Sequence, residues 1–424
     1  MTAATSTAAF TNWHGMSCTS LQALAAEHGT PFYLFDADVV TQRIERVRRA
    51  MQGQAQIYYA VKANPNRVLL EAVRAAADGL DISSDGELEQ ALGAGFEPAR
   101  MSFAGPAKTA AELEAAIRAG VGAISVESVR ELNACADIAG RVGMAAHILL
   151  RVNPLAPSRV FGLKMGGRPV QFGIDEETLP EVEAKVLRHG PLIDFRGIHV
   201  YAGSQGFDPA GLLEATRNTL RIARELEART GLRCAKVNLG GGFGVSSAAD
   251  QRELDVEAFG ALMAPFLAEF HAGSSAPCEL VFELGRYLTA EAGLYVTRVI
   301  SAKASRGKLY FACDGGLHHH LAAAGTFGAA MRTNFAVVNL SQPDAPLVSC
   351  QLAGPSCNPT DLLGVDISLP EPREGSLLGV LRSGSYGMTA SPILFLGHAT
   401  PMELVSMGGQ VVVGRRSFRM ADFN

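Results

Sequence analysis

Residues 56–83 read QIYYAVKANPNRVLLEAVRAAADGLDIS, in which two short β-rich runs flank a helical stretch. The runs, QIYYAVK and GLDIS, contain the β-branched, aliphatic and aromatic residues that favour strands. Alternation of strand and helix is typical of α/β folds with a parallel sheet. This stretch therefore predicts that class of fold.

The same alternation continues along the chain to about residue 285. Eight segments are strand candidates: QIYYAVK (56–62), GLDIS (79–83), MSFAG (101–105), GAISVE (122–127), HILLRVN (147–153), FRGIHVYAG (195–203), AKVNLGGG (235–242) and ELVFELG (279–285). The intervening helices include an apolar stripe over 209–230, and the capping boxes Thr109-x-x-Glu112 and Ser128-x-x-Glu131 mark two helix starts. Eight strands alternating with helices predict a (β/α)8 TIM barrel. A doubly wound sheet is the alternative, although it does not require an eighth strand.

Beyond residue 285 the pattern changes to strand-like runs separated by turn signals. Examples are LYVTRVISAKA (294–304), LVSCQLAG (347–354) and QVVVGRR (410–416). Long helical patterns are scarce, so we expect an all-β domain, a β-barrel or sandwich. The segment TPFYLFD (30–36) is also strand-like and precedes the barrel. We therefore predict a barrel domain over 37–285 and a β domain formed by 1–36 with 286–424.

Composition excludes several classes of protein. The 424 residues are 48% hydrophobic and 19% charged with a net charge of -5, which indicates a globular protein without an electrostatic preference for nucleic acid. No apolar run reaches the roughly 18 residues of a membrane span. The N-terminal residues lack a basic region followed by an apolar core, so no signal peptide is predicted and the cytoplasm is the expected compartment.

The cysteine and histidine patterns argue against a metal site. The seven cysteines form no CxxC pair, so neither a zinc site nor a disulfide framework is expected. His318, His319 and His320 are consecutive, and three consecutive residues of a strand cannot all point one way. We therefore predict no metal.

Chemically distinctive residues fall at the predicted carboxyl ends of the strands, where a TIM barrel places its active site. They are Lys62, Asp81, Arg151, His199, Gly240, Gly241, Gly242 and Glu283. A lysine that closes an apolar strand is costly to bury unless it is used covalently. Taken alone, Lys62 is more simply interpreted as a lysine whose amine reaches solvent.

Together these residues fit the needs of pyridoxal phosphate (PLP), which requires an amine, phosphate donors, a group facing the pyridine nitrogen and an acid–base. The glycines of NLGGGFG (238–244) allow backbone amides to approach a phosphate, and a helix start after them would favour the anion. A carboxylate such as Glu283 keeps the ring nitrogen protonated, which suits decarboxylation. Cys357, in the loop AGPSCNPTD, could donate a proton. Alone, the glycines equally fit a structural tight turn, Glu283 and Arg286 are better interpreted as a surface ion pair, and Cys357 as an incidental cysteine.

The ordered motifs strengthen this interpretation. They are YYAVKAN, GLDISSDGEL, RVNP, GIHVYAGSQ, NLGGGFG, ELGR, DGG, GPSCNPTD and SGSYG, spread over about residues 30 to 415. The set resembles the fold-type III PLP-dependent decarboxylases, the family of diaminopimelate, ornithine and arginine decarboxylases. The resemblance implies PLP as cofactor, decarboxylation of an amino acid as reaction, and a homodimer with active sites at the interface.

The resemblance also implies individual roles. Lys62 corresponds to the lysine that binds PLP covalently, Asp81 and Glu87 to an acidic pair behind it, and Arg151 to the arginine that supports Glu283, the carboxylate facing the pyridine nitrogen. Matching phosphate contacts are Ser204, Gly240, Gly241, Gly242, Arg286 and Tyr386. Cys357 corresponds to a catalytic cysteine contributed across the dimer interface, and Asp314 and Asp361 to substrate-side or loop-holding acids.

Two positions depart from the family pattern. The family places a ring-stacking histidine two residues before the Gly-Ser pair, where this chain has Tyr201; His199, two residues earlier, is the second candidate. The residue after the catalytic cysteine is normally acidic and pairs with a distal ammonium, but here it is Asn358. Leaving a buried charge unpaired costs about 3–5 kcal/mol, so a free diamino acid is disfavoured, although Asp314 could partly compensate.

Three motifs resemble a subgroup of decarboxylases from antibiotic and exopolysaccharide (exosortase-associated) pathways. They are the loop around Asn358, the DGGxHHH run and the SPxxFLGH tail. One of these acts on a glutamyl group tethered to an acyl carrier protein. The resemblance implies a biosynthetic substrate without a free distal ammonium, for which Arg332 could bind a carboxylate or pantetheine oxygen. The alternatives are a diaminopimelate, ornithine or lysine decarboxylase, a non-catalytic PLP-binding paralogue and a metal-dependent barrel enzyme.

Overall fold

The computed structural model describes residues 10–156, 160–248, 250, 252–272, 277–325, 327 and 332–423. The chain divides into two compact units. Thr41–Gly244 with Glu253–Leu288 form the first, which we call the barrel unit, and Met1–Val40, Val245–Arg252 and Thr289–Asn424 form the second, the β unit. The sequence did not indicate that Val245–Arg252, an excursion between two barrel strands, belongs to the β unit.

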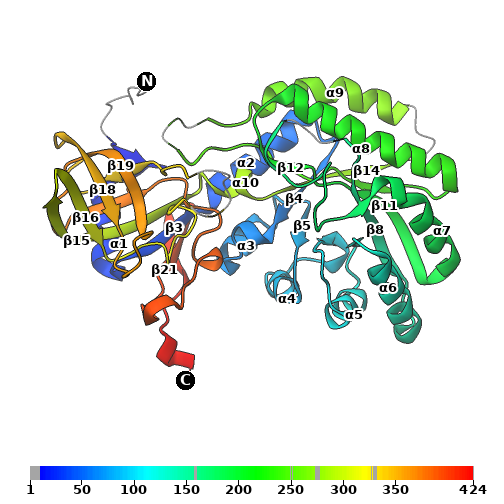
Figure 1. Ribbon diagram of the computed structural model, residues 1–424, viewed down its shortest axis with the longest axis horizontal. Helices are drawn as coiled ribbons and strands as arrows, with labels where there is room; N and C mark the ends of the chain where they lie inside the picture. The colour runs from blue at the N-terminus through cyan, green and yellow to red at the C-terminus, as the bar shows by residue number, and fades with distance from the viewer. Residues whose placement is uncertain are drawn as a thin grey trace. The chain divides into compact units, whose positions relative to one another are not determined.

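The barrel unit is built on a closed ring of parallel strands (Figure 1). In ring order they are β4 (Gln56–Ala60), β5 (Gly79–Ile82), β6 (Met101–Phe103), β7 (Ala123–Val126), β8 (Ala146–Asn153), β11 (Ile193–His199), β13 (Lys236–Asn238) and β14 (Glu279–Leu284). The ring closes because β14 pairs with β4 and β7 pairs with β8. This confirms the predicted TIM barrel and excludes the doubly wound sheet, whose edges stay open.

Helices follow most of the strands, and Figure 1 shows α4 to α8 on the outside of the ring. The helices are α2 (Ala37–Ala50), α3 (Arg67–Val73), α4 (Asp85–Gly93), α5 (Ala110–Ala119), α6 (Val129–Val142), α7 (Leu179–His189), α8 (Pro209–Thr230), α9 (Val256–Ala272) and α10 (Arg286–Thr289). The predicted apolar stripe of α8 is buried. Over the described ranges, no helix has the length and apolar character needed to cross a membrane.

The two predicted capping boxes differ in outcome. Thr109 caps α5 in the expected reciprocal way: its Oγ1 accepts from the Glu112 N–H at 3.2 Å, and the Glu112 carboxylate accepts from the Thr109 N–H at 2.8 Å. Ser128 accepts from the Glu131 N–H at 3.2 Å. The Glu131 carboxylate instead lies buried, 3.1 Å from Lys108 Nζ. The second predicted capping box is therefore only half formed: the bond from the Glu131 N–H to Ser128 is present, but the Glu131 carboxylate pairs with the buried Lys108 instead of the Ser128 N–H.

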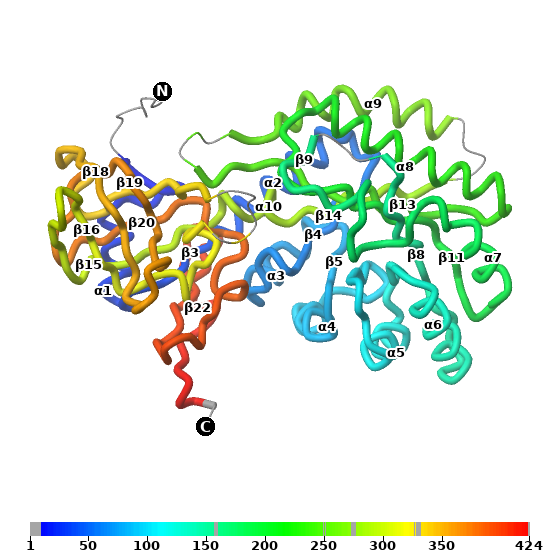
Figure 2. The backbone as a smooth tube through the Cα atoms, in the orientation of Figure 1, coloured from blue at the N-terminus to red at the C-terminus, as the bar shows by residue number. Residues whose placement is uncertain are grey.

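The β unit contains a nine-stranded sheet whose main path runs β19-β18-β16-β15-β3-β21-β22. Its strands are β3 (Phe32–Asp36), β15 (Gly293–Ser305), β16 (Lys308–Cys313), β17 (Val337–Asn339), β18 (Leu347–Ala353), β19 (Leu362–Pro370), β20 (Leu377–Val380), β21 (Met402–Met407) and β22 (Gln410–Arg415). The predicted strand at 30–36 is β3, which pairs with β15 and β21. Figure 2 shows this blue N-terminal strand lying among yellow and orange C-terminal ones.

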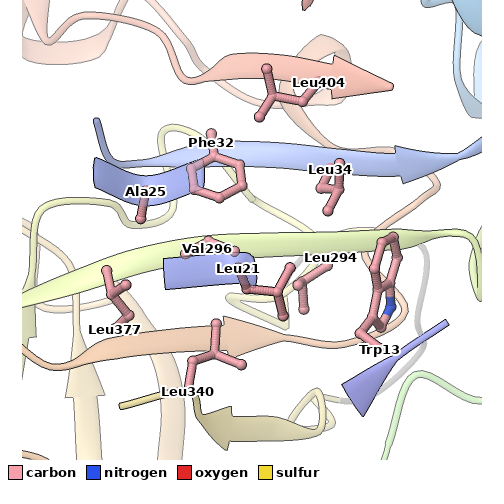
Figure 3. Packing of buried hydrophobic residues seen from close by; sticks show 10 residues of the cluster. All are labelled: Trp13, Leu21, Ala25, Phe32, Leu34, Leu294, Val296, Leu340, Leu377 and Leu404. Carbon is pink, nitrogen blue, oxygen red and sulfur yellow. The ribbon is translucent and has the colours of Figure 1, made fainter. Parts of the chain in front are cut away.

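The N-terminal segment is held in the β unit by a shared hydrophobic core (Figure 3). Before β3 the segment forms the short strands β1 (Asn12–Trp13) and β2 (Met16–Ser17) and the helix α1 (Cys18–His28). The buried side chains drawn in Figure 3 are Trp13, Leu21, Ala25, Phe32, Leu34, Leu294, Val296, Leu340, Leu377 and Leu404. Half of them precede the barrel in sequence and half follow it. Burial of this apolar surface explains why chain segments about 260 residues apart form one unit.

Candidate active site

Lys62 lies just beyond the end of β4. The strand ends at Ala60, two residues earlier than predicted, and Lys62 occupies the 3₁₀ turn η1 (Val61–Ala63). Its Nζ lies 2.6 Å from Oδ2 of Asp81, a residue of β5. The side chain of Asp81 is fully buried. The Lys62 side chain keeps 39% of its surface exposed. The amine is therefore paired by an acid on one side and accessible on the other.

The acidic pair behind Lys62 is held in a poorly solvated environment. Burial raises the pKa of Asp81, and the Glu283 carboxylate raises it further, while Lys62 opposes the shift. Burial also raises the pKa of Glu87 to about 7. A hydrogen bond from the Ser83 N–H at 2.6 Å acts in the opposite direction but is outweighed by burial. Both carboxyls therefore hold a proton more readily than exposed acids do.

The raised pKa of Glu87 predicts a pH-dependent stability of the cofactor-free protein. The unfolded chain releases the Glu87 proton near pH 4.5 and the folded chain near 7. The free energy of unfolding should therefore fall as pH rises through this window, by about 3 kcal/mol at most. In E87Q this fall should be clearly smaller, with the remainder due to Asp81, whose pKa is also raised, as measured by urea denaturation at pH 5 and pH 8. E89Q, at an exposed site on the same helix, should behave as wild type; an unchanged pH dependence in E87Q would contradict the prediction.

Glu283, near the end of β14, is buried and has two polar neighbours. Its Oε2 accepts a hydrogen bond from Asn238 Nδ2 at 2.8 Å, and its Oε1 lies 3.3 Å from Nε2 of His199. Burial has the largest single effect and would raise the pKa of Glu283, but His199, Lys62 and Asn238 together outweigh it and lower the pKa below its usual range. Glu283 is thus held as a carboxylate inside the barrel.

The expected support of Glu283 by Arg151 is not what the structure shows. Arg151, on β8, instead donates from Nη1 to Oε1 of Glu127 at 2.7 Å. Glu127 also accepts from the N–H groups of Gly105 at 2.9 Å and Gly173 at 3.0 Å. Both partners of this ion pair are buried. Two backbone hydrogen bonds from the barrel rim fix Glu127, so Arg151 pairs with it rather than with Glu283.

The glycine turn after β13 has no room for side chains. A Cβ on Gly241 would lie 2.1 Å from the carbonyl oxygen of Glu283, and one on Gly242 would lie 2.0 Å from that of Gly203. Among the described residues, no acceptor faces the N–H groups of Gly241 and Gly242. The helix expected to start after the turn is absent, since α9 begins only at Val256. Backbone donors of the turn, rather than a helix terminus, are thus available for an anion.

The remaining predicted phosphate contacts of the barrel unit lie after strands too. Ser204 is half-buried on the short strand β12 (Gly203–Gly206), which pairs with β9 (Phe161–Lys164). Arg286 is half-buried at the first position of α10, directly after β14. Their roles as phosphate contacts stay predictions.

His199 and Tyr201 occupy different environments. His199 is the last residue of β11, and its ring is fully buried, with Nδ1 2.9 Å from Ser125 Oγ. Tyr201 follows the strand and is half-buried. Because the His199 ring is already enclosed by protein side chains, the geometry favours Tyr201 as the ring that stacks on a cofactor.

In the β unit, two predicted acids hold the protein itself together. The Asp314 carboxylate accepts from Thr30 Oγ1 at 2.5 Å, Thr297 Oγ1 at 2.7 Å and the Arg298 N–H at 2.9 Å. Both of its oxygens are thus used within the β unit. This geometry favours the loop-holding role over contact with substrate.

Asp361 ties the cysteine loop to the DGG run. Its buried carboxylate accepts from the N–H groups of Leu317, at 2.6 Å, and Ser356, at 3.0 Å. Cys357 is exposed on this loop. Asn358 is engaged locally, since its Oδ1 accepts from the N–H of Thr360 at 3.0 Å. Asp361 therefore fixes the loop and leaves the Cys357 thiol accessible.

Three further predicted features lie in the β unit. Arg332 donates to the carbonyl of Leu362 at 2.6 Å, which uses part of its guanidinium. Tyr386 adopts a positive φ of 54° and packs against Phe327 with 5.6 Å between ring centroids. The three consecutive histidines are buried: the ring centroids of His318 and His319 lie 3.8 Å apart, whereas His320 Nε2 lies 2.9 Å from Ser383 Oγ.

Sequence reasoning missed three residues of the barrel interior: Ser125, Glu127 and Asn238. Ser125 and Glu127 stand in the run SVES at the end of the fourth strand, and Asn238 begins NLGGG. A polar residue inside a strand, or directly after it at the catalytic end of a barrel, was the available signal. Each was hidden because its partner lies at least 24 residues away in the chain.

The residues present fit PLP. Lys62 offers an accessible amine, Glu283 a buried anion for a ring nitrogen, and the N–H groups of Gly241 and Gly242 offer unused donors for a phosphate. These groups lie at the ends of β4, β14 and β13, which are hydrogen-bonded neighbours in the order β13-β14-β4. An amine, an anion and phosphate donors on adjacent strand ends match the demands of the cofactor.

Known proteins resemble this chain over nearly its whole length. Residues 37–290 match the family described as pyridoxal-dependent decarboxylase, pyridoxal binding domain. The L-glutamyl-[BtrI acyl-carrier protein] decarboxylase of Niallia circulans is 37% identical over 93% of this chain and 93% of that protein. The 2-[(L-alanin-3-ylcarbamoyl)methyl]-2-hydroxybutanedioate decarboxylase of Staphylococcus aureus is 30% identical over 90% of this chain and 95% of that protein.

A solved structure matches both units. The crystal structure of diaminopimelate decarboxylase from Helicobacter pylori complexed with L-lysine has a TM-score of 0.84 and 26% sequence identity, covering 95% of this chain and 98% of that one. The arrangement of a barrel with a β-rich remainder is therefore shared with that enzyme.

Proposed function

Because this chain belongs to the family of pyridoxal-dependent decarboxylases, we propose that it decarboxylates an amino-acid group that lacks a free distal ammonium and is presented by an acyl carrier protein. The chain is an enzyme with PLP as its cofactor, a carboxy-lyase. The observation that carries the substrate proposal is Asn358, a neutral residue next to Cys357 where the family resemblance leads one to expect an acid.

The chemistry can be divided between cofactor and protein. PLP, when bound, supplies an electron sink for the pair left behind as carbon dioxide departs. Lys62 would hold the cofactor, with the Asp81 carboxylate accepting a hydrogen bond from its amine. Glu283, held as an anion, would face the ring nitrogen and keep a proton on it. The N–H groups of Gly241 and Gly242 would bind the phosphate.

Cys357 would deliver the proton that replaces the carboxylate. Its side chain is exposed in the isolated chain, and it stands on a loop that Asp361 holds from two sides. A thiol on a fixed, accessible loop suits donation into a site completed by a second copy of the chain. We therefore propose a homodimer, with Cys357 reaching the active site of the partner subunit.

Two relatives support a substrate without a distal ammonium. The Niallia circulans enzyme is named for an L-glutamyl group on an acyl carrier protein, and the Staphylococcus aureus enzyme is named for a substrate whose far end is a hydroxybutanedioate. Neither substrate presents an amine at the end remote from the reacting carbon. Asn358 suits such substrates because an amide leaves no buried charge unpaired.

The second candidate is decarboxylation of free diaminopimelate, favoured by the similarity to the diaminopimelate decarboxylase structure. The purified enzyme should turn over a glutamyl-thioester of a carrier protein at least ~100-fold faster, in kcat/KM, than diaminopimelate, ornithine or lysine, since an unpaired buried ammonium costs about 3–5 kcal/mol. Carbon dioxide release measures this. Rapid turnover of a free diamino acid would overturn the carrier-bound proposal.

N358D tests the same point from the protein side. The new carboxylate should raise kcat/KM for free diamino acids by about tenfold or more, because it offers the distal ammonium a partner. It can still accept from the N–H of Thr360, so the loop should keep its shape. N358A, the matched control, lacks both carbonyl and charge and should give no gain; equal gains in both variants would contradict a charge effect.

A further inference from the structure

Three buried polar side chains meet inside the barrel although their strands are not neighbours. Ser125, His199 and Glu283 lie on β7, β11 and β14, and no two of these strands are hydrogen-bonded to each other. Side chains on separated strands of a ring can touch only through its interior. Because branched apolar residues normally fill that space, polar ones here indicate a functional arrangement.

His199 is the central member of this group. Its Nδ1 lies 2.9 Å from Ser125 Oγ, and its Nε2 lies 3.3 Å from Glu283 Oε1. The second approach is within ion-pair distance but is not aligned as a hydrogen bond, so Nε2 has no hydrogen-bond partner among the described residues. A buried ring nitrogen in this position is costly unless charge attraction compensates for it.

Asn238, the other partner of Glu283, fixes the orientation of the Glu283 carboxylate. Asn238 Nδ2 donates to Oε2 at 2.8 Å, so the two carboxylate oxygens face different partners. Asn238 Oδ1 in turn accepts from the Gly240 N–H at 2.9 Å. The amide is thereby anchored to the glycine turn, and Glu283 is clamped between the amide and the His199 ring.

We infer that His199 is a positioning residue that holds Glu283 anionic and oriented for the cofactor ring, with Ser125 fixing the orientation of the imidazole. The inference rests on the proposed binding of PLP at this barrel end. It assigns His199 a place behind Glu283 instead of against the face of the ring. The lowered pKa of Glu283 is consistent with this role, since His199 is the largest favourable contribution to it.

Other charged groups surround this pair on the neighbouring strands. Asp81 on β5 interacts with both Glu283 and His199, and Lys62 pairs with Asp81. Arg151 is the register partner of His199 on β8, but its charge is paired with Glu127. Near Ser125, Lys108 Nζ donates a hydrogen bond to the Ser125 carbonyl oxygen, and its charge is paired with Glu131.

The test compares H199Q, H199A and S125A with wild type. H199Q keeps a polar side chain but removes the imidazole ring that faces Glu283. If the imidazole facing Glu283 is required, both His199 variants should lower kcat about 10- to 100-fold with KM within about threefold, because Glu283 acts on the cofactor and not on substrate binding. S125A, which leaves the imidazole in place, should have a smaller effect.

Two further readouts do not depend on turnover. The dissociation constant of PLP should rise about tenfold or more in both His199 variants. The acidic limb of the pH dependence of PLP binding should move upward by about one pH unit, since Glu283 would then protonate more easily. H147Q, in the same barrel on β8 and paired with Asp194 at 2.8 Å, is the matched control and should match wild type.

The outcomes separate this inference from the proposed function. H199Q and H199A with a wild-type pH profile and PLP affinity would overturn the role of His199 while leaving the decarboxylase assignment intact. H199Q restoring wild-type values where H199A does not would show that any polar side chain of this size suffices, which also overturns the inference. A wild-type protein that binds no PLP would overturn both.

Discussion

Replacing Lys62 by alanine is expected to abolish decarboxylation, with a loss on the order of 10³-fold or more in kcat. The physical reason is that Lys62 has the accessible amine 2.6 Å from Asp81 at the barrel end, where a covalent bond to the cofactor aldehyde would form. Without it, the cofactor can be held only by non-covalent contacts. Borohydride reduction of the wild-type enzyme followed by peptide mapping should place the cofactor on the peptide that contains Lys62.

K303A serves as the control, because Lys303 is an exposed lysine of the β unit. It should retain wild-type activity and the same labelled peptide. A label on another lysine, or a K62A enzyme with near wild-type kcat, would refute the assignment of Lys62. Since loss of Lys62 also leaves Asp81 buried without its partner, the thermal midpoint of K62A should be measured alongside activity.

Substitution of Glu283 by glutamine is expected to lower kcat by about 10²- to 10³-fold. Glutamine has nearly the same shape but no charge, so it can no longer keep a proton on the ring nitrogen of the electron sink. It also leaves His199 facing a neutral amide inside the barrel. The loss should appear in kcat more than in KM, because the carboxylate stabilises charge that develops during the reaction.

E279Q, on the same strand, is the matched control. Glu279 begins β14 at the opposite end from Glu283 and pairs with Lys236 at 2.9 Å. Its loss should leave kcat unchanged, since it lies at the end of the barrel remote from the cofactor site. Equal effects of E279Q and E283Q would mean that activity depends on strand stability and not on a carboxylate at the catalytic end.

Local patterns predicted much of the fold. All eight barrel strands were found at their approximate positions, because their apolar runs and the helices between them are written in contiguous sequence. The helix Pro209–Thr230 was predicted with its stripe, and the strand at 30–36 was assigned to the second sheet. Errors occurred at strand ends, as at Lys62, where a 3₁₀ turn replaces the last two predicted strand residues.

The candidate site was predicted as a set of residue types and not as a set of contacts. Lys62 and Asp81 were expected to be close, and they form an ion pair. Arg151 was expected to support Glu283, but it pairs with Glu127 because backbone N–H groups of the rim already hold that carboxylate in place. Asp314 was considered for substrate contact, yet both of its oxygens are used within the β unit.

The sequence by itself determined the order of strands and helices, the residue types at the strand ends and hence the class of chemistry, since burial patterns and motifs are local properties of the chain. Only the tertiary structure decided which side chains meet: Ser125 with His199, Asn238 with Glu283 and Glu127 with Arg151. These partners are 24 to 74 residues apart. They become neighbours when the ring of strands closes, because closure places the carboxyl ends of separate strands around one interior.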